Sequence, residues 1–313
     1  MTRPADSELV ALLLTQRLVE AEASPLKAAE FWSVVECVPD LGALLGLRPD
    51  EIGETAQVDE STAQRIGALL AAATAFAFAL DDAQQSGLRL LSGLSEHFPA
   101  VMKERLGRAA PPLLYVFGDA GLLGQSALGI VGSRTVSEGG SKIAREAALA
   151  AVKAGLGVIS GGAKGVDRLA MNAAVDAGGH VVGVVADSLL RTARDSEVRR
   201  AVNDDQLCLC SPYKPTAGFS VANAMGRNKL IYAMSTATLV VECEEGSGGT
   251  WAGAVEALRG RTAPVIAWTG VGASSGNIAL AHRGAHPLGV VEDLFPLPSH
   301  EVVLTPAQLR LDF

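Results

Sequence analysis

Two glycine-rich segments carry the residues best suited to bind phosphate, Gly129-Ile130-Val131-Gly132-Ser133-Arg134 and Ser160-Gly161-Gly162-Ala163-Lys164-Gly165-Val166-Asp167. Glycines let the backbone approach an anion, backbone amides and hydroxyls donate hydrogen bonds, and arginine and lysine supply positive charge. We therefore predict phosphate contacts by Gly132, Ser133, Arg134, Ser160, Gly161, Gly162, Lys164 and Gly165. Asp167 is expected to order its loop, because a carboxylate repels phosphate.

Two later segments have related chemistry. Gly226-Arg227-Asn228-Lys229 places two cations near the start of a predicted helix, and Gly246-Ser247-Gly248-Gly249-Thr250 opens another helix with glycines and hydroxyls. A helix amino end attracts anions. The candidate contacts here are Arg227, Asn228, Lys229, Ser247, Gly248, Gly249 and Thr250. Taken singly, each segment is also compatible with a structural turn or a solvated helix face.

The sequence shows no catalytic or metal-binding set. The five histidines are scattered, and no serine lies in a G-x-S-x-G turn. His282 and His286 have i, i+4 spacing, but Gly284 and Pro287 argue against a helix there. We therefore expect a binding protein that is not an enzyme and that uses neither a cofactor nor a metal.

The phosphate-binding segments follow or precede predicted strands and helices that alternate after residue 111. We expect strands at 113–118, 127–131, 157–160, 180–186, 206–210, 238–242 and 264–267, with helices starting near residues 139, 166, 196, 221 and 249. Strands of continuous apolar residues are typical of a parallel sheet covered on both faces. The predicted fold class is α/β, a doubly wound parallel sheet of Rossmann-like type, which binds ligands at the carboxyl ends of its strands.

The first 110 residues are expected to form a small all-helical domain. Apolar residues recur at helical spacing over 8–22 and 26–35, and a long alanine-rich helix is expected from Asp59 to Leu80. Pro111-Pro112 marks the boundary. The predicted domains are thus 1–110, helical; 111–298, Rossmann-like; and 299–313, a short tail.

The composition restricts how the protein can bind nucleic acid. The net charge of −8 requires any such site to be a local patch, and the 4% of aromatic residues disfavours an extended base-stacking surface. The four cysteines form no C-x-x-C pair, and neither a signal peptide nor a membrane-spanning stretch is seen. We expect a cytoplasmic protein that does not contact the membrane.

In their order along the chain, the four segments resemble the DNA-processing family DprA, also called Smf. The segments that carry the resemblance are 130–134, 160–167, 227–229 and 247–252, supported by Phe98-Pro99 and by 114–118 upstream. Gly270, Ser275-Gly276-Asn277 and Gly284-Ala285 are similar to the family's late glycine loops. The chain departs from the family pattern at Met171, where members have histidine, and over a stretched 219–229 segment. The winged-helix tail of many members is not expected here.

The resemblance implies a Rossmann-like protein that binds single-stranded DNA, forms a homodimer and loads the recombinase RecA during natural transformation. Arg134, Lys164, Arg227 and Lys229 would contact DNA phosphates. An alternative is a nucleotide-binding or nucleotide-hydrolysing protein similar to the lysine-decarboxylase-like phosphoribohydrolases, with Glu256 as the nearest acid/base candidate. A third is an oligomeric interaction protein whose loops have lost their ligand.

Overall fold

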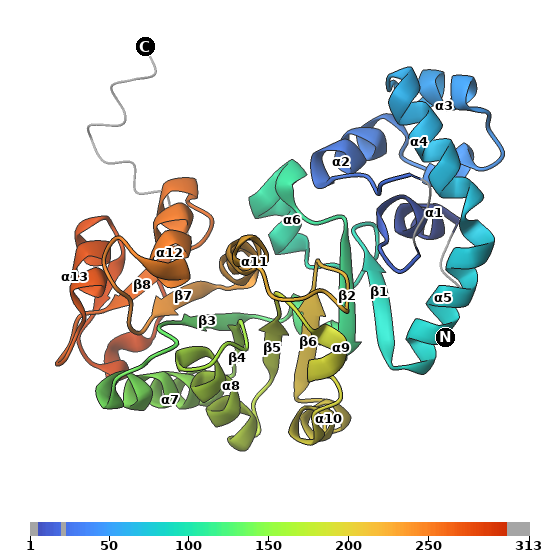
Figure 1. Cartoon of the computed structure of the whole chain (residues 1–313). Coiled ribbons are helices and arrows are strands. Elements are labelled where there is room, and N and C mark those ends of the chain that lie inside the picture. Colours follow the sequence, from blue (N-terminus) through green and yellow to red (C-terminus); the bar gives the residue numbers. More distant parts are fainter. Residues whose placement is uncertain (1–5, 20–22, 299–313) are drawn as a thin grey trace, which may run out of the picture.

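The structure, a computed structural model, describes residues 6–19 and 23–298 of the chain. Figure 1 shows one large twisted sheet with helices on both faces, preceded by a helical region. In these described residues the sheet has nine strands: β1 (Leu88–Ser92), β2 (Leu113–Gly118), β3 (Ala127–Val131), β4 (Gly157–Ser160), β5 (Val181–Val184), β6 (Leu207–Ser211), β7 (Ala237–Val240), β8 (Val265–Trp268) and β9 (His286–Leu288). The predicted fold class is confirmed.

The strand order creates a crevice in the middle of the sheet. The order is β1-β2-β6-β5-β4-β3-β7-β8-β9, parallel from β6 to β9, with β2 and β1 added antiparallel at one edge. From β3 the chain winds outward through β4, β5 and β6, and then returns to place β7 on the other side of β3. The strand order therefore reverses between β3 and β7, and ligands of such sheets bind at this point.

Two apolar layers cover the sheet. One face packs against α7 (Glu138–Lys153), α8 (Val166–Asp176) and α10 (Ser196–Asn203). The other packs against α6 (Ala100–Leu106), α11 (Val221–Met234) and α12 (Gly248–Gly260). Every residue of β3, β5, β7 and β8 is buried, which is why their sequences lack the alternation of a half-exposed strand. The rigid layers fix where each strand-to-helix loop begins.

The amino-terminal region consists of α1 (Asp6–Thr15), α2 (Ala28–Cys37), α3 (Pro49–Ala56), α4 (Glu60–Ala71) and α5 (Ala73–Gln85). The single helix expected from Asp59 to Leu80 is instead two helices, bent by 57° between Ala71 and Ala73. The two halves bury different side chains: Ile66 lies in the helical core, and Phe76 packs against the sheet. Among the described helices none alone is long and apolar enough to span a membrane; α4 and α5 meet that measure only as this bent pair.

The sheet begins before the boundary expected at residue 111. β1 pairs with β2 along its whole length, with Leu90 opposite Tyr115, and α6 also precedes Pro111. Trp32 of α2 ties the helical region to this segment, because its indole donates to the carbonyl of Ala110 over 2.8 Å. The all-helical region therefore ends at α5. The predicted tail, 299–313, lies outside the described residues.

Asn277 connects the ends of β7 and β8 to α13 (Ser275–His282). This fully buried side chain donates from Nδ2 to the carbonyls of Val240, Val241 and Trp268, each over 3.0 Å. Its Oδ1 accepts from the amide of Cys243 over 3.0 Å. One amide group thus fixes the loop that leaves β7 and leads to α12.

We predict that Asn277→Ala lowers the free energy of unfolding by about 2–3 kcal/mol, because several buried backbone groups are left without partners. Urea denaturation measures this decrease. Asn172→Ala, at an exposed position in α8, is the matched control and should change stability by less than about 0.5 kcal/mol. Equal stability of the two variants would contradict the role given to Asn277.

Candidate functional site

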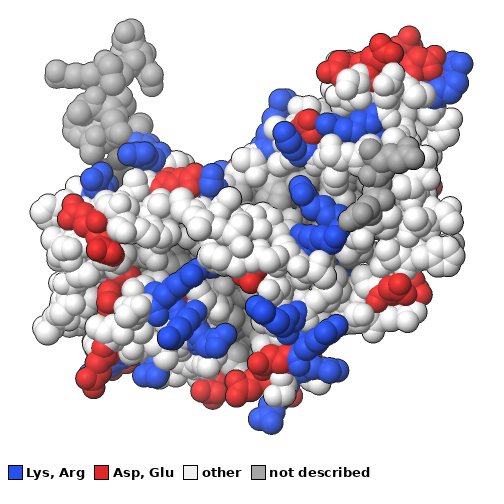
Figure 2. Space-filling view, viewed as in Figure 1, with Lys and Arg blue, Asp and Glu red and all other residues white. Residues whose placement is uncertain are grey.

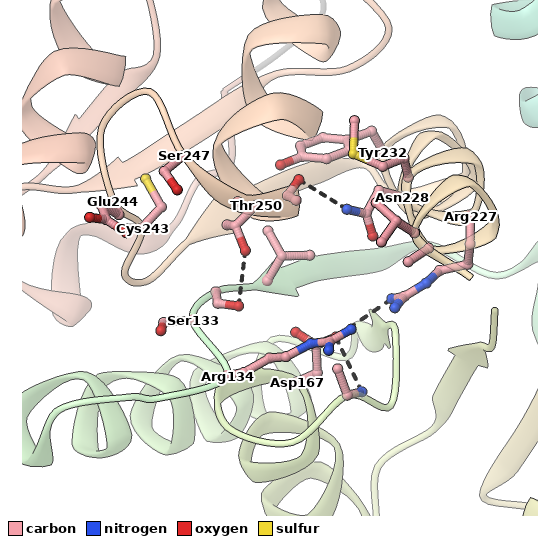
Figure 3. Close-up of a pocket in the computed structure, with 18 of the residues that line it drawn as sticks. Ser133, Arg134, Asp167, Arg227, Asn228, Tyr232, Cys243, Glu244, Ser247 and Thr250 are labelled. Atoms are coloured by element: carbon pink, nitrogen blue, oxygen red, sulfur yellow. Dashed lines mark hydrogen bonds and ion pairs between the residues drawn. The ribbon is translucent and has the colours of Figure 1, made fainter. Parts of the chain in front are cut away.

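A cavity of about 390 Å³ opens at the reversal point between β3 and β7. Its walls come from the turns after β3 and β4, from the loop after β7, from α11 and the residue Phe219 ahead of it, and from the first turn of α12 (Figure 3). Predicted site residues that line it are Gly132, Ser133, Arg134, Asp167, Arg227, Asn228, Ser247, Gly248, Gly249 and Thr250. All four predicted segments therefore contribute to one site. Ser160, Gly161, Gly162, Lys164, Gly165 and Lys229 are not among the lining residues.

The two glycine-rich turns interlock beneath this cavity. The amide of Val166 donates to the carbonyl of Ser133 over 3.2 Å. A Cβ at Gly165, whose φ is +91°, would lie 2.3 Å from that same carbonyl oxygen, and a Cβ at Gly132 would lie 2.5 Å from the side chain of Val166. These two glycines are thus required for the turns to pack against each other, which is a different role from direct phosphate contact.

A buried ion pair lies between these turns and α11. Asp167 Oδ2 is 3.6 Å from Arg227 Nη1, and both side chains are over nine-tenths buried. Asp167 Oδ2 also accepts from the amide of Ala163, within its own turn, over 3.4 Å. Burial raises the pKa of Asp167, opposed by Arg227, and burial lowers the pKa of Arg227.

Arg227 occupies the space above Gly161. A Cβ at Gly161 would lie 1.1 Å from Arg227 Nη1, so the glycine makes room for the guanidinium. Arg227 therefore supports the turn between β4 and α8 from within, although the family resemblance implied a contact with DNA phosphate. Ser160 is also internal, because its hydroxyl donates to the carbonyl of Ile130 over 2.6 Å and the residue is fully buried.

The amino end of α7 is occupied by protein groups. Ser137 Oγ accepts from the amide of Gly140, while Glu242 Oε2 accepts from the amide and the hydroxyl of Ser137 over 3.2 and 2.7 Å. Ser133 turns its hydroxyl to the carbonyl of Thr135 over 2.8 Å. The first turn of the helix after β3 is thus occupied by side chains of the protein itself.

The amino end of α12 is held in place but left uncapped. Thr250 Oγ1 donates to the carbonyl of Gly132 over 3.0 Å, and Asn228 Nδ2 donates to the carbonyl of Gly249 over 3.1 Å (Figure 3). Ser247 precedes the helix without forming a side-chain cap. Thr250 and Asn228 therefore position a helix end whose first residues line the cavity and whose first amides have no side-chain cap.

The remaining predicted cations differ in their surroundings. Arg134 is exposed, and its guanidinium lies 5.1 Å from the ring centroid of Phe219. Lys164 is exposed on the β4 turn. Lys229 instead forms an ion pair with Glu256 of α12, over 2.7 Å, outside the cavity. In the described part of the chain, no group of three metal-ligating side chains occurs.

Sequence inspection missed further exposed residues along the same edge. Phe219 is 55% exposed beside Arg134. Figure 2 shows lysine and arginine side chains gathered from the β4–α8 turn toward α10. The exposed cations between this turn and the loop after β6 include Arg168, Arg191, Arg194 and Lys214. The β5 and β6 loops are held together by the amide of Ser188, which donates to the carbonyl of Ala217. The cluster of arginines over residues 191–200 is the sequence feature from which this group of exposed cations could have been predicted.

Residues 89–297 match the model of the family described as DNA recombination-mediator protein A. The chain belongs to this family. Among its relatives, DNA processing protein DprA of Bacillus subtilis is 24% identical over 71% of this chain and 75% of the relative. Protein Smf of Synechocystis is 28% identical over 54% of this chain and 43% of the relative. The chain spans about half the length of the first curated relatives it matches.

Solved structures of the family share the fold. DprA from Streptococcus pneumoniae has a TM-score of 0.68 at 21% identity, covering 93% of this chain and 97% of that one. DNA processing protein A from Helicobacter pylori, a structure described by its single-stranded DNA binding mode, has a TM-score of 0.54 at 20% identity, covering 66% and 92%. The family match begins at residue 89, at β1, and so includes the strand ahead of Pro111.

We predict strong coupling between Asp167 and Arg227. Asp167→Asn or Arg227→Met should each cost about 3–5 kcal/mol of stability, because each leaves a buried charge without its partner. The double variant should be destabilised by less than the sum of the two. Urea denaturation of all four proteins gives the coupling energy.

The exposed pair Lys229–Glu256 provides the matched control for that cycle. Both side chains are about half exposed, so Lys229→Met and Glu256→Gln should show a coupling below about 1 kcal/mol. Additive effects at Asp167 and Arg227 would show that the buried pair does not hold the turn to α11.

Proposed function

We propose that this protein binds single-stranded DNA along the carboxyl edge of its sheet, by contacts and not by catalysis. The observation that carries the proposal is the exposed Arg134 stacked on the exposed ring of Phe219 at the mouth of the cavity. A guanidinium offers two parallel hydrogen bonds to a phosphate, and an exposed ring offers a face for a base. Together they match the two repeating parts of a nucleotide chain.

The spread of charge favours a polymer over a single small ligand. Arg134 and Lys164 follow neighbouring strands, and Lys214 lies on the loop after β6 farther along the same edge. A nucleic-acid backbone carries a phosphate at every residue, so cations spaced over several loops can each meet one. Because the whole chain has a net charge of −8, a polyanion is attracted only where cations cluster, and we propose that this edge is such a place.

The structure offers less support for nucleotide hydrolysis. Glu256, the acid/base candidate from the sequence, is paired with Lys229 and is not among the cavity residues. The carboxylates that do line the cavity are Asp167, which is paired with Arg227, and the exposed Glu244. We therefore retain DNA binding as the proposed function.

The family also supports a biological role in recombination. The matching model is described as a recombination mediator, and the Helicobacter pylori neighbour is described as binding single-stranded DNA. We extend the proposal to a cytoplasmic homodimer that loads RecA on single strands during DNA uptake. Light scattering measures whether the protein is a dimer in solution. An assay of RecA filament assembly on single strands coated with this protein measures whether it loads RecA.

We predict that Arg134→Ala and Lys164→Ala each weaken binding to a deoxythymidine oligonucleotide and reduce its salt dependence. The slope of log affinity against log salt should fall by about 0.7 for each phosphate of a single strand that the protein no longer neutralises. Fluorescence anisotropy over a series of salt concentrations measures both quantities.

Lys153→Ala is the matched control for these two variants. It removes the same charge from the exposed last turn of α7, at the opposite edge of the sheet, and should leave the slope unchanged. The proposed function fails if the wild type does not bind the oligonucleotide, or if its affinity is insensitive to salt.

We predict that Phe219→Ala weakens oligonucleotide binding by about 1–3 kcal/mol, the range for one stacked base, with little change in the salt slope. Phe78→Ala, which removes a 72% exposed ring from α5, should have no effect and controls for the removal of an apolar surface. Fluorescence anisotropy over the same series of salt concentrations measures the affinity and the slope for both variants. A reduced slope, with affinity lost mainly at low salt as expected for Arg134→Ala, would mean that Phe219 acts only by placing Arg134.

A further inference from the structure

The cavity at the reversal point contains buried donors that lack an acceptor. Within the described chain, the hydroxyl of Tyr232 and the Nε of Arg227 are both buried without a hydrogen-bond partner, and both residues line the cavity. Buried polar groups in proteins are nearly always paired. Two unpaired donors on residues that line the same cavity therefore point to a ligand with more than one acceptor atom.

Tyr232 is the more informative of the two, because it has no ionic partner. It is 2% exposed and lies on α11, against α12, where a Cβ at Gly253 would be 3.3 Å from its ring. In Figure 3 its hydroxyl points to the side on which Cys243 and Ser247 lie. Burial raises its pKa above the ordinary value, so the hydroxyl stays protonated and can donate.

The second donor group is the amino end of α12, a helix of thirteen residues. Ser247 does not cap it, whereas Ser137, Ser220 and Ser274 cap α7, α11 and α13 with their hydroxyls. A Cβ at Gly248 would meet nothing within 4 Å, so this end is open. Free amides and the helix dipole at such an end favour a phosphate.

The volume sets the size of the ligand. At about 390 Å³ the cavity lies near the lower end of the range of ~300–1,000 Å³ found for small-ligand pockets. It accommodates one nucleotide and not a run of several. A nucleotide inside a strand must connect to neighbours on both sides, whereas a terminal or free nucleotide does not. A terminal phosphate also carries more charge and more free acceptor oxygens than a phosphodiester, which suits a site rich in donors.

We propose that this cavity binds a single nucleotide through a phosphate monoester, supplied either by the end of a DNA strand or by a free nucleoside monophosphate. The phosphate lies at the amino end of α12, and Tyr232 donates to an acceptor of the same nucleotide. The strand-end form rests on the proposed function, because the rest of the strand then runs over Arg134 and Phe219. Glu244, the exposed carboxylate of the cavity, stays in solvent.

The test compares ligands that differ only in their phosphate ends. Titration calorimetry is carried out with a deoxythymidine oligonucleotide bearing a 5′-phosphate, a 3′-phosphate or only hydroxyls, and with thymidine monophosphate. If the strand end is the ligand, one phosphorylated oligonucleotide should bind about tenfold more tightly than the hydroxyl form, the scale of one hydrogen bond to a charged group. If the free nucleotide is the ligand, thymidine monophosphate should bind, and the oligonucleotides should not differ.

Tyr232→Phe should abolish whichever of these signals the wild type shows, while leaving the affinity for the hydroxyl oligonucleotide unchanged. Its fold should be intact, since the hydroxyl that it removes has no protein partner. Tyr213→Phe is the matched control, because this half-buried tyrosine lies outside the lining of the cavity. Ser247→Asp is a second variant: it places a carboxylate cap on α12, which stabilises the helix and should exclude the phosphate.

The outcomes separate this inference from the proposed function. Equal binding of all three oligonucleotides, with no binding of thymidine monophosphate, overturns the nucleotide site and leaves DNA binding intact. A phosphate preference that survives in both Tyr232→Phe and Ser247→Asp also overturns it. Failure of every oligonucleotide to bind would instead defeat the proposed function.

Discussion

The buried pair of Asp167 and Arg227 is the interaction on which the carboxyl edge of the sheet depends. Removing two charges from water is costly, and such a pair seldom adds net stability. Here it joins α8 to α11, which belong to opposite faces of the sheet, and places the guanidinium over Gly161. The position of α11 in turn determines where Asn228 meets α12. We infer that the pair is retained because it fixes the geometry of the site.

Much of the fold could be predicted from local sequence, because strands buried on both faces are continuous apolar runs. The elements that escaped prediction depend on distant contacts. β1 contains the exposed Arg89 and is defined by its pairing with β2. β9 has only three residues, two of them exposed. The bend between α4 and α5 occurs within an alanine-rich run that carries no helix-breaking residue, because the two halves pack into different cores.

The location of the site was easier to predict than the roles of its residues. Glycine turns at strand ends must meet at one edge of a parallel sheet, so the convergence of the four segments followed from topology. Whether a cation is free depends on partners that are far away in sequence. Arg227 is buried against Asp167, and the exposed Lys229 is paired with Glu256, whereas the exposed Arg134 lies over the ring of Phe219. Phe219 could not be predicted as a site residue, because Arg134, whose guanidinium lies over its ring, is distant along the chain.

The amino ends of the helices at this edge differ in whether protein groups already occupy them. α7, α11 and α13 are capped by their own serines, Glu242 adds a carboxylate at α7, and α8 carries Asp167 in its first turn. These groups satisfy or neutralise amides that would otherwise attract phosphate. α12 is the exception among the described helices that line the cavity. In the proposed binding mode, the exposed cations hold a strand along the edge without regard to position, while the open end of α12 supplies one fixed point at which a phosphate can stop.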